Sequence, residues 1–159
     1  MTETALTLFG RKVVGGRAEG HALVTTQAIA GWGGIDPLTG TIIEKEHELF
    51  GVSFAGKVLV FPGAKGSSSW SAFFHTTRLA GVNPKALVFT RTTTRVALGA
   101  AVLRVPSVTD LVQNPLSHIK TGDWVEVDGD RGKITAVRRT ETALASEGAA
   151  DRRTRYVIT

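Results

Sequence analysis

Residues 57–90 read KVLVFPGAKGSSSWSAFFHTTRLAGVNPKALVFT and contain the pattern of a strand, a turn, a helix and a second strand. Residues 57–61 form a compact apolar run between a glycine and a proline, which is typical of a buried strand. Residues 86–90 form a second short apolar run after Pro84. A strand, a helix and a strand in this order predict two parallel strands joined by a right-handed crossover.

The helix of this unit is predicted by the spacing of its side chains. Positions i, i+3, i+4 and i+7 of one helical face are taken by Trp70, Phe73, Phe74 and Thr77. We expect a serine before this face to cap the helix N-terminus. Gly81 is typical of the residue that follows a helix C-terminus, so the helix should end just before it.

Upstream of this unit the sequence predicts strands separated by glycine-rich turns. A double glycine follows residues 13–14, and residues 21–29 then alternate loosely in the manner of a strand. Residues 31–40, GWGGIDPLTG, contain four glycines and a proline, which exclude a regular element and indicate a shaped loop. Residues 41–43 favour a short strand.

Downstream, the pattern predicts one more helix and several strands. Small residues dominate 95–103, which favours a closely packed helix, and residues 105–108 favour a strand. Residues 124–137 have the strand, tight glycine turn and strand of a hairpin. Residues 141–153 are expected to be a surface loop or frayed helix, with a last strand at 156–158. The predicted fold class is therefore α/β and rich in strands.

The composition indicates one globular domain spanning residues 1–159, because 42% of the residues are hydrophobic and can build a single core. No cysteine is present, which excludes disulfides, thiolate metal sites and a cysteine nucleophile. Neither a signal peptide nor an apolar run of membrane-spanning length is found, so we expect a cytoplasmic protein and no membrane partner.

The charge and the histidines narrow the possible partners. The net charge of +5 would suit an anionic small molecule, an acidic protein or nucleic acid. Much of the excess lies in late arginines without interleaved aromatic side chains, so nucleic acid is ranked last. The four histidines are far apart and never at metal-ligand spacing, so no metal site is expected on this chain.

The segment GAKGSSSW at residues 63–70 is the best candidate for chemistry. Several hydroxyls follow a glycine turn at the first turn of a helix, where free N–H groups and the helix dipole favour an anion. One serine could act as a base if a cation such as Lys65 lies nearby, while ordinary helix capping and a solvated lysine are the alternatives. The segment lacks the P-loop spacing, so ATP is not indicated.

Five segments in order resemble the aconitase X small subunit or swivel domain. They read VVGGRAEGHALV, GWGGIDPLTGTII, HELFGVSFAGKVLVFPGAKGSSSWS, VALGAAV and IKTGDWVEVDGDRG, and they cover most of residues 11–137. This group includes cis-3-hydroxy-L-proline dehydratases and phosphomevalonate dehydratases. The resemblance implies a swivelling β/β/α domain, a closed or nearly closed barrel with helices, that docks on a larger catalytic chain.

The resemblance also implies roles for the serine segment. Ser67 corresponds to the base that removes the substrate proton, and Lys65, Gly66, Ser68 and Ser69 are expected to bind substrate. Aconitase itself carries an arginine at the position of Ser69, so Lys65 or the partner would have to supply that cationic contact. The tryptophan that follows the serines is expected to narrow the pocket. An iron or iron–sulfur centre is expected on the large subunit, with no cofactor bound by this chain.

The expected function is therefore that of a hydro-lyase small subunit, active only with its large subunit, that dehydrates a small hydroxy acid. The preferred substrate is cis-3-hydroxy-L-proline, because nothing in the chain demands a phosphate and the composition resembles that of bacterial proteins. The first alternative is phosphomevalonate. The second is a non-catalytic docking module in which the serines only cap a helix.

Overall fold

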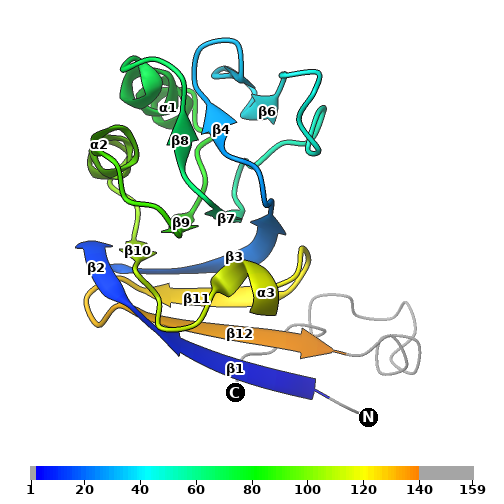
Figure 1. Cartoon of the computed structure of the whole chain (residues 1–159), viewed down its shortest axis with the longest axis vertical. Helices are drawn as coiled ribbons and strands as arrows, with labels where there is room; N and C mark the ends of the chain where they lie inside the picture. Colours follow the sequence, from blue (N-terminus) through cyan, green and yellow to red (C-terminus); the bar gives the residue numbers. More distant parts are fainter. Residues whose placement is uncertain (1–2, 140–159) are drawn as a thin grey trace.

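The computed structural model describes residues 3–139, and a mixed sheet organises them (Figure 1). Within these residues eight strands hydrogen-bond in the order β1-β12-β11-β3-β7-β9-β10-β2. In that order they are β1 (Glu3–Phe9), β12 (Lys133–Arg139), β11 (Trp124–Asp128), β3 (Arg17–Val24), β7 (Val58–Phe61), β9 (Ala86–Phe89), β10 (Ser107–Thr109) and β2 (Arg11–Val14).

The two ends of this strand order are joined through Gly10. β1 pairs antiparallel with β12, and β2, which follows after Gly10 alone, pairs antiparallel with β10. Figure 1 shows β1 and β2 as one bent blue strand. A side chain at Gly10 would meet the Thr109 carbonyl oxygen at 2.5 Å, so glycine is required at the bend. The sheet therefore closes into a barrel, which confirms the expected barrel-like, strand-rich α/β fold.

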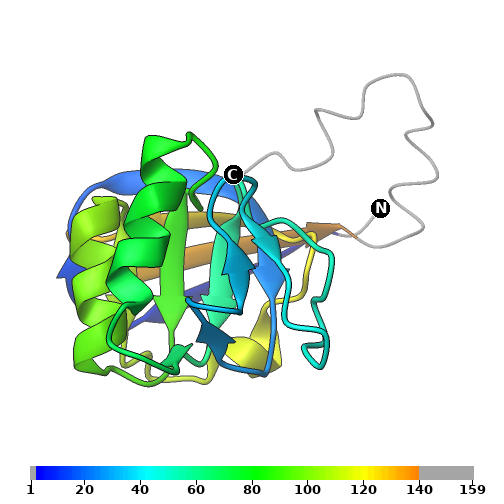
Figure 2. The same cartoon turned by 90° about the horizontal axis from the view of Figure 1, so that it is seen from above.

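The parallel half of the sheet contains the unit predicted from residues 57–90. β3, β7, β9 and β10 run parallel, and α1 (Trp70–Leu79) and α2 (Thr94–Leu103) connect β7 to β9 and β9 to β10. The two helices contact each other and lie side by side outside the strands (Figure 2). Both predicted helices are confirmed, and Gly81 follows α1 with a φ of 75°.

Alternate side chains of the central strands fill two separate cores. In β7, Val58 and Val60 face the barrel interior, whereas Leu59 and Phe61 face the helices. β9 alternates in the same way. These strands are buried on both faces because helices cover one side and the barrel wall covers the other, which explains their continuous apolar runs.

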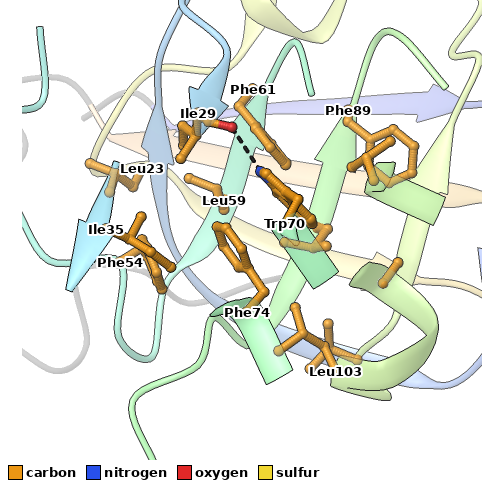
Figure 3. Close-up of a cluster of buried hydrophobic side chains, with 14 of the residues drawn as sticks. Leu23, Ile29, Ile35, Phe54, Leu59, Phe61, Trp70, Phe74, Phe89 and Leu103 are labelled. Atoms are coloured by element: carbon orange, nitrogen blue, oxygen red, sulfur yellow. Dashed lines mark hydrogen bonds between the residues drawn. The ribbon is translucent and has the colours of Figure 1, made fainter. Parts of the chain in front are cut away.

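Trp70 lies in the core beneath the helices (Figure 3). Its side chain is 0% exposed and stacks on Phe74, with ring centroids 3.9 Å apart, and on Phe61. Its indole Nε1 donates a 2.7 Å hydrogen bond to the Ile29 carbonyl. The expectation that Trp70 narrows a pocket beside the serines is therefore wrong. The indole ring is buried because an amphipathic helix packs its large apolar side chains against the core.

Shorter elements complete the described part of the chain. β4 (Ile29–Ala30) pairs parallel with β8 (Ala64–Lys65), and β5 (Ile35–Asp36) pairs antiparallel with β6 (Thr41–Ile42). A single-turn helix, α3, spans Pro115–His118. The glycine-rich loop at 31–40 is thus mostly turns, as predicted, with β5 inside it.

The strand predicted at residues 21–29 is displaced. β3 begins earlier, at Arg17, and ends at Val24. It ends there because the Thr25 hydroxyl donates a hydrogen bond to the Glu48 carboxylate and accepts one, 3.1 Å long, from the Gln27 amide. This turn breaks the strand before β4. The hairpin of β11 and β12 is confirmed. The loop and strand expected at 141–153 and 156–158 lie outside the described residues.

Candidate active site

The serine loop, residues 66–69, links β8 to α1. Gly66 has a φ of 90°, a conformation that favours glycine, and it turns the chain out of β8. Ser67 and Ser68 are exposed, and Ser69 is half-buried at the position directly before α1. The structure therefore presents the first two serines to the outside of the molecule at the N-terminus of a ten-residue helix.

The hydroxyl of Ser69 contacts Ser67 and does not cap the helix. The two Oγ atoms lie 2.5 Å apart, and the Ser69 amide donates to Ser67 Oγ at 3.2 Å. The Ser69 side chain makes no capping hydrogen bond. A serine therefore occupies the N-cap position, as predicted, but its hydroxyl binds the Ser67 hydroxyl and makes no capping hydrogen bond.

This arrangement favours negative charge on Ser67 Oγ. An amide N–H already points at that oxygen, the Ser69 hydroxyl can donate a second hydrogen bond, and the positive end of the α1 dipole begins three residues later. Each of these contacts favours the ionised form of a hydroxyl over the neutral form. These contacts favour a serine base, and the role of Ser67 as the base stays a prediction.

Lys65 does not face the serines as a free cation. Its Nζ atom lies 2.8 Å from Glu44 Oε2, and this ion pair joins β8 to the segment that follows β6. Because Glu44 already compensates its charge, Lys65 is a weaker candidate for the missing cationic contact than the sequence suggested.

The structure brings a different cation to the serine loop. Arg95 Nη1 donates a 2.8 Å hydrogen bond to the Gly66 carbonyl at the surface, and the residue as a whole is half-buried. Among the described residues Arg95 has no ion-pair partner, and its Nε atom is buried without a hydrogen bond. Sequence reasoning missed this residue because it follows the serines by nearly thirty positions.

The topology explains why Arg95 reaches the loop. β7 and β9 are parallel, so their carboxyl ends meet at one edge of the sheet, and the helices that follow them begin there. Arg95 is the second residue of α2. A search of the first turns of both helices for charged side chains would have found it.

A segment with exposed apolar side chains leaves β4 beside the serine loop. β4 pairs with β8, and the 31–53 segment starts directly after it at the same end of the molecule (Figure 1). It carries five exposed apolar residues, namely Trp32 (75%), Leu38 (68%), Ile43 (43%), Phe50 (53%) and Val52 (38%). Two of them, Trp32 and Leu38, belong to the predicted glycine-rich loop.

Within residues 3–139 the available donor groups do not fit an iron or iron–sulfur centre. No cysteine occurs in the sequence, and residues 3–139 contain no group of three or more histidine, aspartate or glutamate side chains placed to hold a metal ion. Nor does any helix in that part of the chain have the length and apolar character needed to cross a membrane.

Comparison with known proteins agrees with the fold described above. Residues 7–136 match the aconitase X swivel domain family. The chain belongs to the aconitase X swivel domain family. The resemblance inferred from the sequence is thereby confirmed over nearly the whole described region.

Relatives within this family give the enzyme class. The phosphomevalonate dehydratase small subunit of Methanocella arvoryzae is 46% identical over 125 residues, which cover 79% of this chain and 95% of the relative. The one from Archaeoglobus fulgidus is 42% identical over 127 residues, covering 80% and 96%. The solved structure of Thermococcus kodakaraensis aconitase X in its holo-form superposes with a TM-score of 0.78 at 38% identity, covering 82% of this chain and 98% of that one.

These relatives confirm that the chain is a small subunit of an aconitase X-like dehydratase, a class whose small subunits work with a larger catalytic subunit. The relatives carry the name of the first alternative substrate, phosphomevalonate. The preferred substrate, cis-3-hydroxy-L-proline, finds no support in their names.

Proposed function

We propose that this chain supplies Ser67 as the proton-abstracting base to a hydro-lyase site that a large subunit completes. The observation that supports this role most is the position of Ser67. The residue is exposed at the positive end of α1, and its Oγ atom accepts a 3.2 Å hydrogen bond from the Ser69 amide. Ser68, next to it and also exposed, is proposed to bind substrate together with Gly66 and Ser69.

In the proposed step, ionised Ser67 removes a proton from the carbon next to the one that bears the leaving hydroxyl. The electrons of that C–H bond form the carbon–carbon double bond, the C–O bond breaks, and the hydroxide leaves as water after protonation. We propose that an iron or iron–sulfur centre lies on the large subunit, where such a centre would assist departure of the hydroxyl. The Ser67 hydroxyl, the Ser69 amide and the Ser69 hydroxyl are the part that this chain contributes.

The proposed substrate is phosphomevalonate. Relatives that are 46% and 42% identical over nearly their full lengths carry this activity in their names. An anionic substrate also suits a site that combines a helix N-terminus with a cation at the same loop. We therefore place phosphomevalonate ahead of cis-3-hydroxy-L-proline, which becomes the comparison substrate.

The 31–53 segment is the proposed docking face for the large subunit. Ser67 can act only if the partner's substrate lies against the serine loop, and the exposed apolar side chains begin two residues after the β4–β8 pairing that supports this loop. Complete burial of a fully exposed apolar side chain of this size is favourable by roughly 1.5–3 kcal/mol, and each of these partly exposed side chains would contribute less than that to a complex.

The proposal is tested with the purified chain, its large subunit and the reconstituted complex. Dehydration of phosphomevalonate and of cis-3-hydroxy-L-proline is followed separately by the appearance of the unsaturated product. We expect turnover of phosphomevalonate by the complex only, and none by either subunit alone. Turnover of cis-3-hydroxy-L-proline instead would overturn the substrate, and full activity of the large subunit alone would overturn the contribution of this chain.

A further inference from the structure

We propose that Arg95 binds an anionic group of the substrate, carboxylate or phosphate, beside Ser67. This inference rests on the proposed function and adds a substrate-binding residue that the serine motif does not contain. It is carried by three features of the structure, namely the contact of Arg95 with the loop, its missing counter-ion and the state of the neighbouring cation.

The first feature is the hydrogen bond from Arg95 Nη1 to the Gly66 carbonyl, 2.8 Å long. Gly66 directly precedes Ser67, so this bond attaches the guanidinium to the residue next to the proposed base. An arginine head group is planar and carries five N–H donors. One donor is used on the loop and the Nε–H is buried, so the remaining Nη donors are the ones that a ligand from outside could reach.

The second feature is the absence of a counter-ion. No ion pair within the described part of the chain involves Arg95. Its Nε atom is buried and has no hydrogen-bond partner in this part of the chain. The residue is half-buried and no carboxylate in this part of the chain pairs with its charge, so we infer that an anion from outside the chain pairs with the Nη donors.

The third feature is the state of the neighbouring cation. Lys65 is held 2.8 Å from Glu44, so its charge is already paired. Arg95 is therefore the cation at the serine loop whose pairing is incomplete. Ser69, which stands directly before α1, brings hydrogen-bond donors to the loop but no charge.

A carboxylate of the large subunit is the competing source of the anion. The substrate is favoured because Arg95 is tied to the loop that carries the two exposed serines, and the proposed reaction brings the substrate to these serines. A partner carboxylate would affect assembly of the complex, whereas a substrate anion would affect the Michaelis constant. The two sources can thus be separated by measurement.

The test compares Arg95→Gln and Arg95→Lys in the reconstituted complex. Arg104→Gln is the matched control, because it removes the same charge at the opposite end of α2. We expect Arg95→Gln to raise KM by about 10- to 100-fold, the loss that follows when a charge-assisted hydrogen bond is removed. Arg95→Lys should recover part of this loss, and the Kd for assembly and the control variant should stay at wild-type values.

Three results would overturn the inference. An unchanged KM in Arg95→Gln excludes substrate binding. A weaker assembly Kd with unchanged KM assigns the residue to the partner. A lower kcat with unchanged KM shows that Arg95 only holds the loop in place.

A second readout does not depend on turnover. Inorganic phosphate is titrated into the isolated chain while NMR follows the Arg95 Nε–H and Gly66 amide signals. We expect a saturable shift of both signals in the wild type and no shift of the Gly66 amide signal in Arg95→Gln. If the wild-type complex is inactive yet this shift is seen, the proposed function fails while anion binding stands; if the shift is absent, the Arg95 inference fails.

Discussion

Ser69 stands directly before α1, yet its hydroxyl contacts Ser67 and leaves the helix uncapped. The sequence predicted a capping serine because hydroxyl side chains are common at this position. Which atom a serine binds depends on the turn before the helix, and the positive φ of Gly66 decides that turn. Ser67 and Ser69 therefore form a hydrogen-bonded pair across Ser68, which local sequence rules could locate but could not orient.

Replacing Ser69 by alanine should lower activity more than stability. Ser67 Oγ would lose the hydroxyl 2.5 Å away, which costs the ionised oxygen about 1.4 kcal/mol and lowers kcat about tenfold. The unfolding free energy should change by less than about 0.5 kcal/mol, because no capping bond is lost. Thermal unfolding and kcat of the complex check both values, with Ser71→Ala in the first turn of α1 as control. The proposed role of the Ser67–Ser69 contact would be contradicted if Ser69→Ala lost stability but kept kcat at the wild-type level.

Gly99 allows Trp70 to pack between the helices. A Cβ atom at Gly99 would lie 2.1 Å from Trp70 Cζ3, inside a core where the ring is fixed on both sides. Gly99→Ala should therefore destabilise the fold by about 1–3 kcal/mol, although alanine is the better helix former. Urea unfolding measures the change, and Leu98→Ala on the exposed face of α2 should cost much less. A stabilised Gly99→Ala would show that the two helices can separate at no cost.

At the scale of elements, Glu48 fastens the 31–53 segment to the end of β3. Its carboxylate accepts hydrogen bonds from the Thr25 hydroxyl and, at 2.8 Å, from the Thr26 amide, and these contacts lower the pKa of Glu48. The Glu48 amide in turn donates to Gln27 Oε1 at 2.9 Å. The turn that ends β3 is thus held by contacts between residues 21 to 23 positions apart in the sequence.

The lowered pKa of Glu48 makes stability depend on pH in a defined window. Because the unfolded state binds the proton more readily, the contribution of Glu48 is complete above about pH 4.5 and is lost as the pH falls through the lower pKa of the folded state. Glu48→Gln should lower the unfolding free energy by about 1 kcal/mol at neutral pH, a small value because the side chain is exposed. The variant should also show a weaker fall of the unfolding free energy between neutral and acidic pH. Unfolding free energies measured across this pH range test the prediction, with Glu46→Gln as control. The prediction would be contradicted if the unfolding free energy of Glu48→Gln fell at acidic pH as steeply as that of the wild type.

The elements differ in how well the sequence predicted them. β7, α1 and β9 were predicted because their signals are local, an apolar run or a helical spacing ended by glycine or proline. β1 was missed because it is held by pairing with β12, more than 120 residues away. Arg95 was missed for the same reason, since its contact with Gly66 follows from the parallel pairing of β7 and β9 and from no motif.

At the scale of the whole molecule, closure of the barrel gives the serine loop a rigid base. β7 and β9 are buried on both faces, and the helices that follow them begin at one edge of the sheet. The serine loop, Arg95 and the exposed 31–53 segment all lie at this edge or beside it. One end of the molecule therefore combines the candidate chemistry with the candidate docking face.

Assembly should depend on the exposed tryptophan of this end. Trp32→Ser removes a side chain that is 75% exposed, and we expect the Kd for the large subunit to rise by at least about tenfold, as for a buried aromatic anchor of an interface. Val112→Ser, which removes an 86% exposed apolar side chain next to β1, is the control and should leave the Kd unchanged. Calorimetric titration gives both constants. Equal effects of the two variants, or none, would place the partner elsewhere.

The most direct test of the central claim is the exchange of the substrate proton with D₂O in the complex, measured for wild type, Ser67→Ala and Ser68→Ala. The account predicts that Ser67→Ala lowers the rate of deuterium incorporation and kcat together by about 100-fold or more while the complex still assembles, because the base is missing. Ser68→Ala should act mainly on KM. Deuterium incorporation at the wild-type rate in Ser67→Ala would contradict the account and assign proton abstraction to the large subunit.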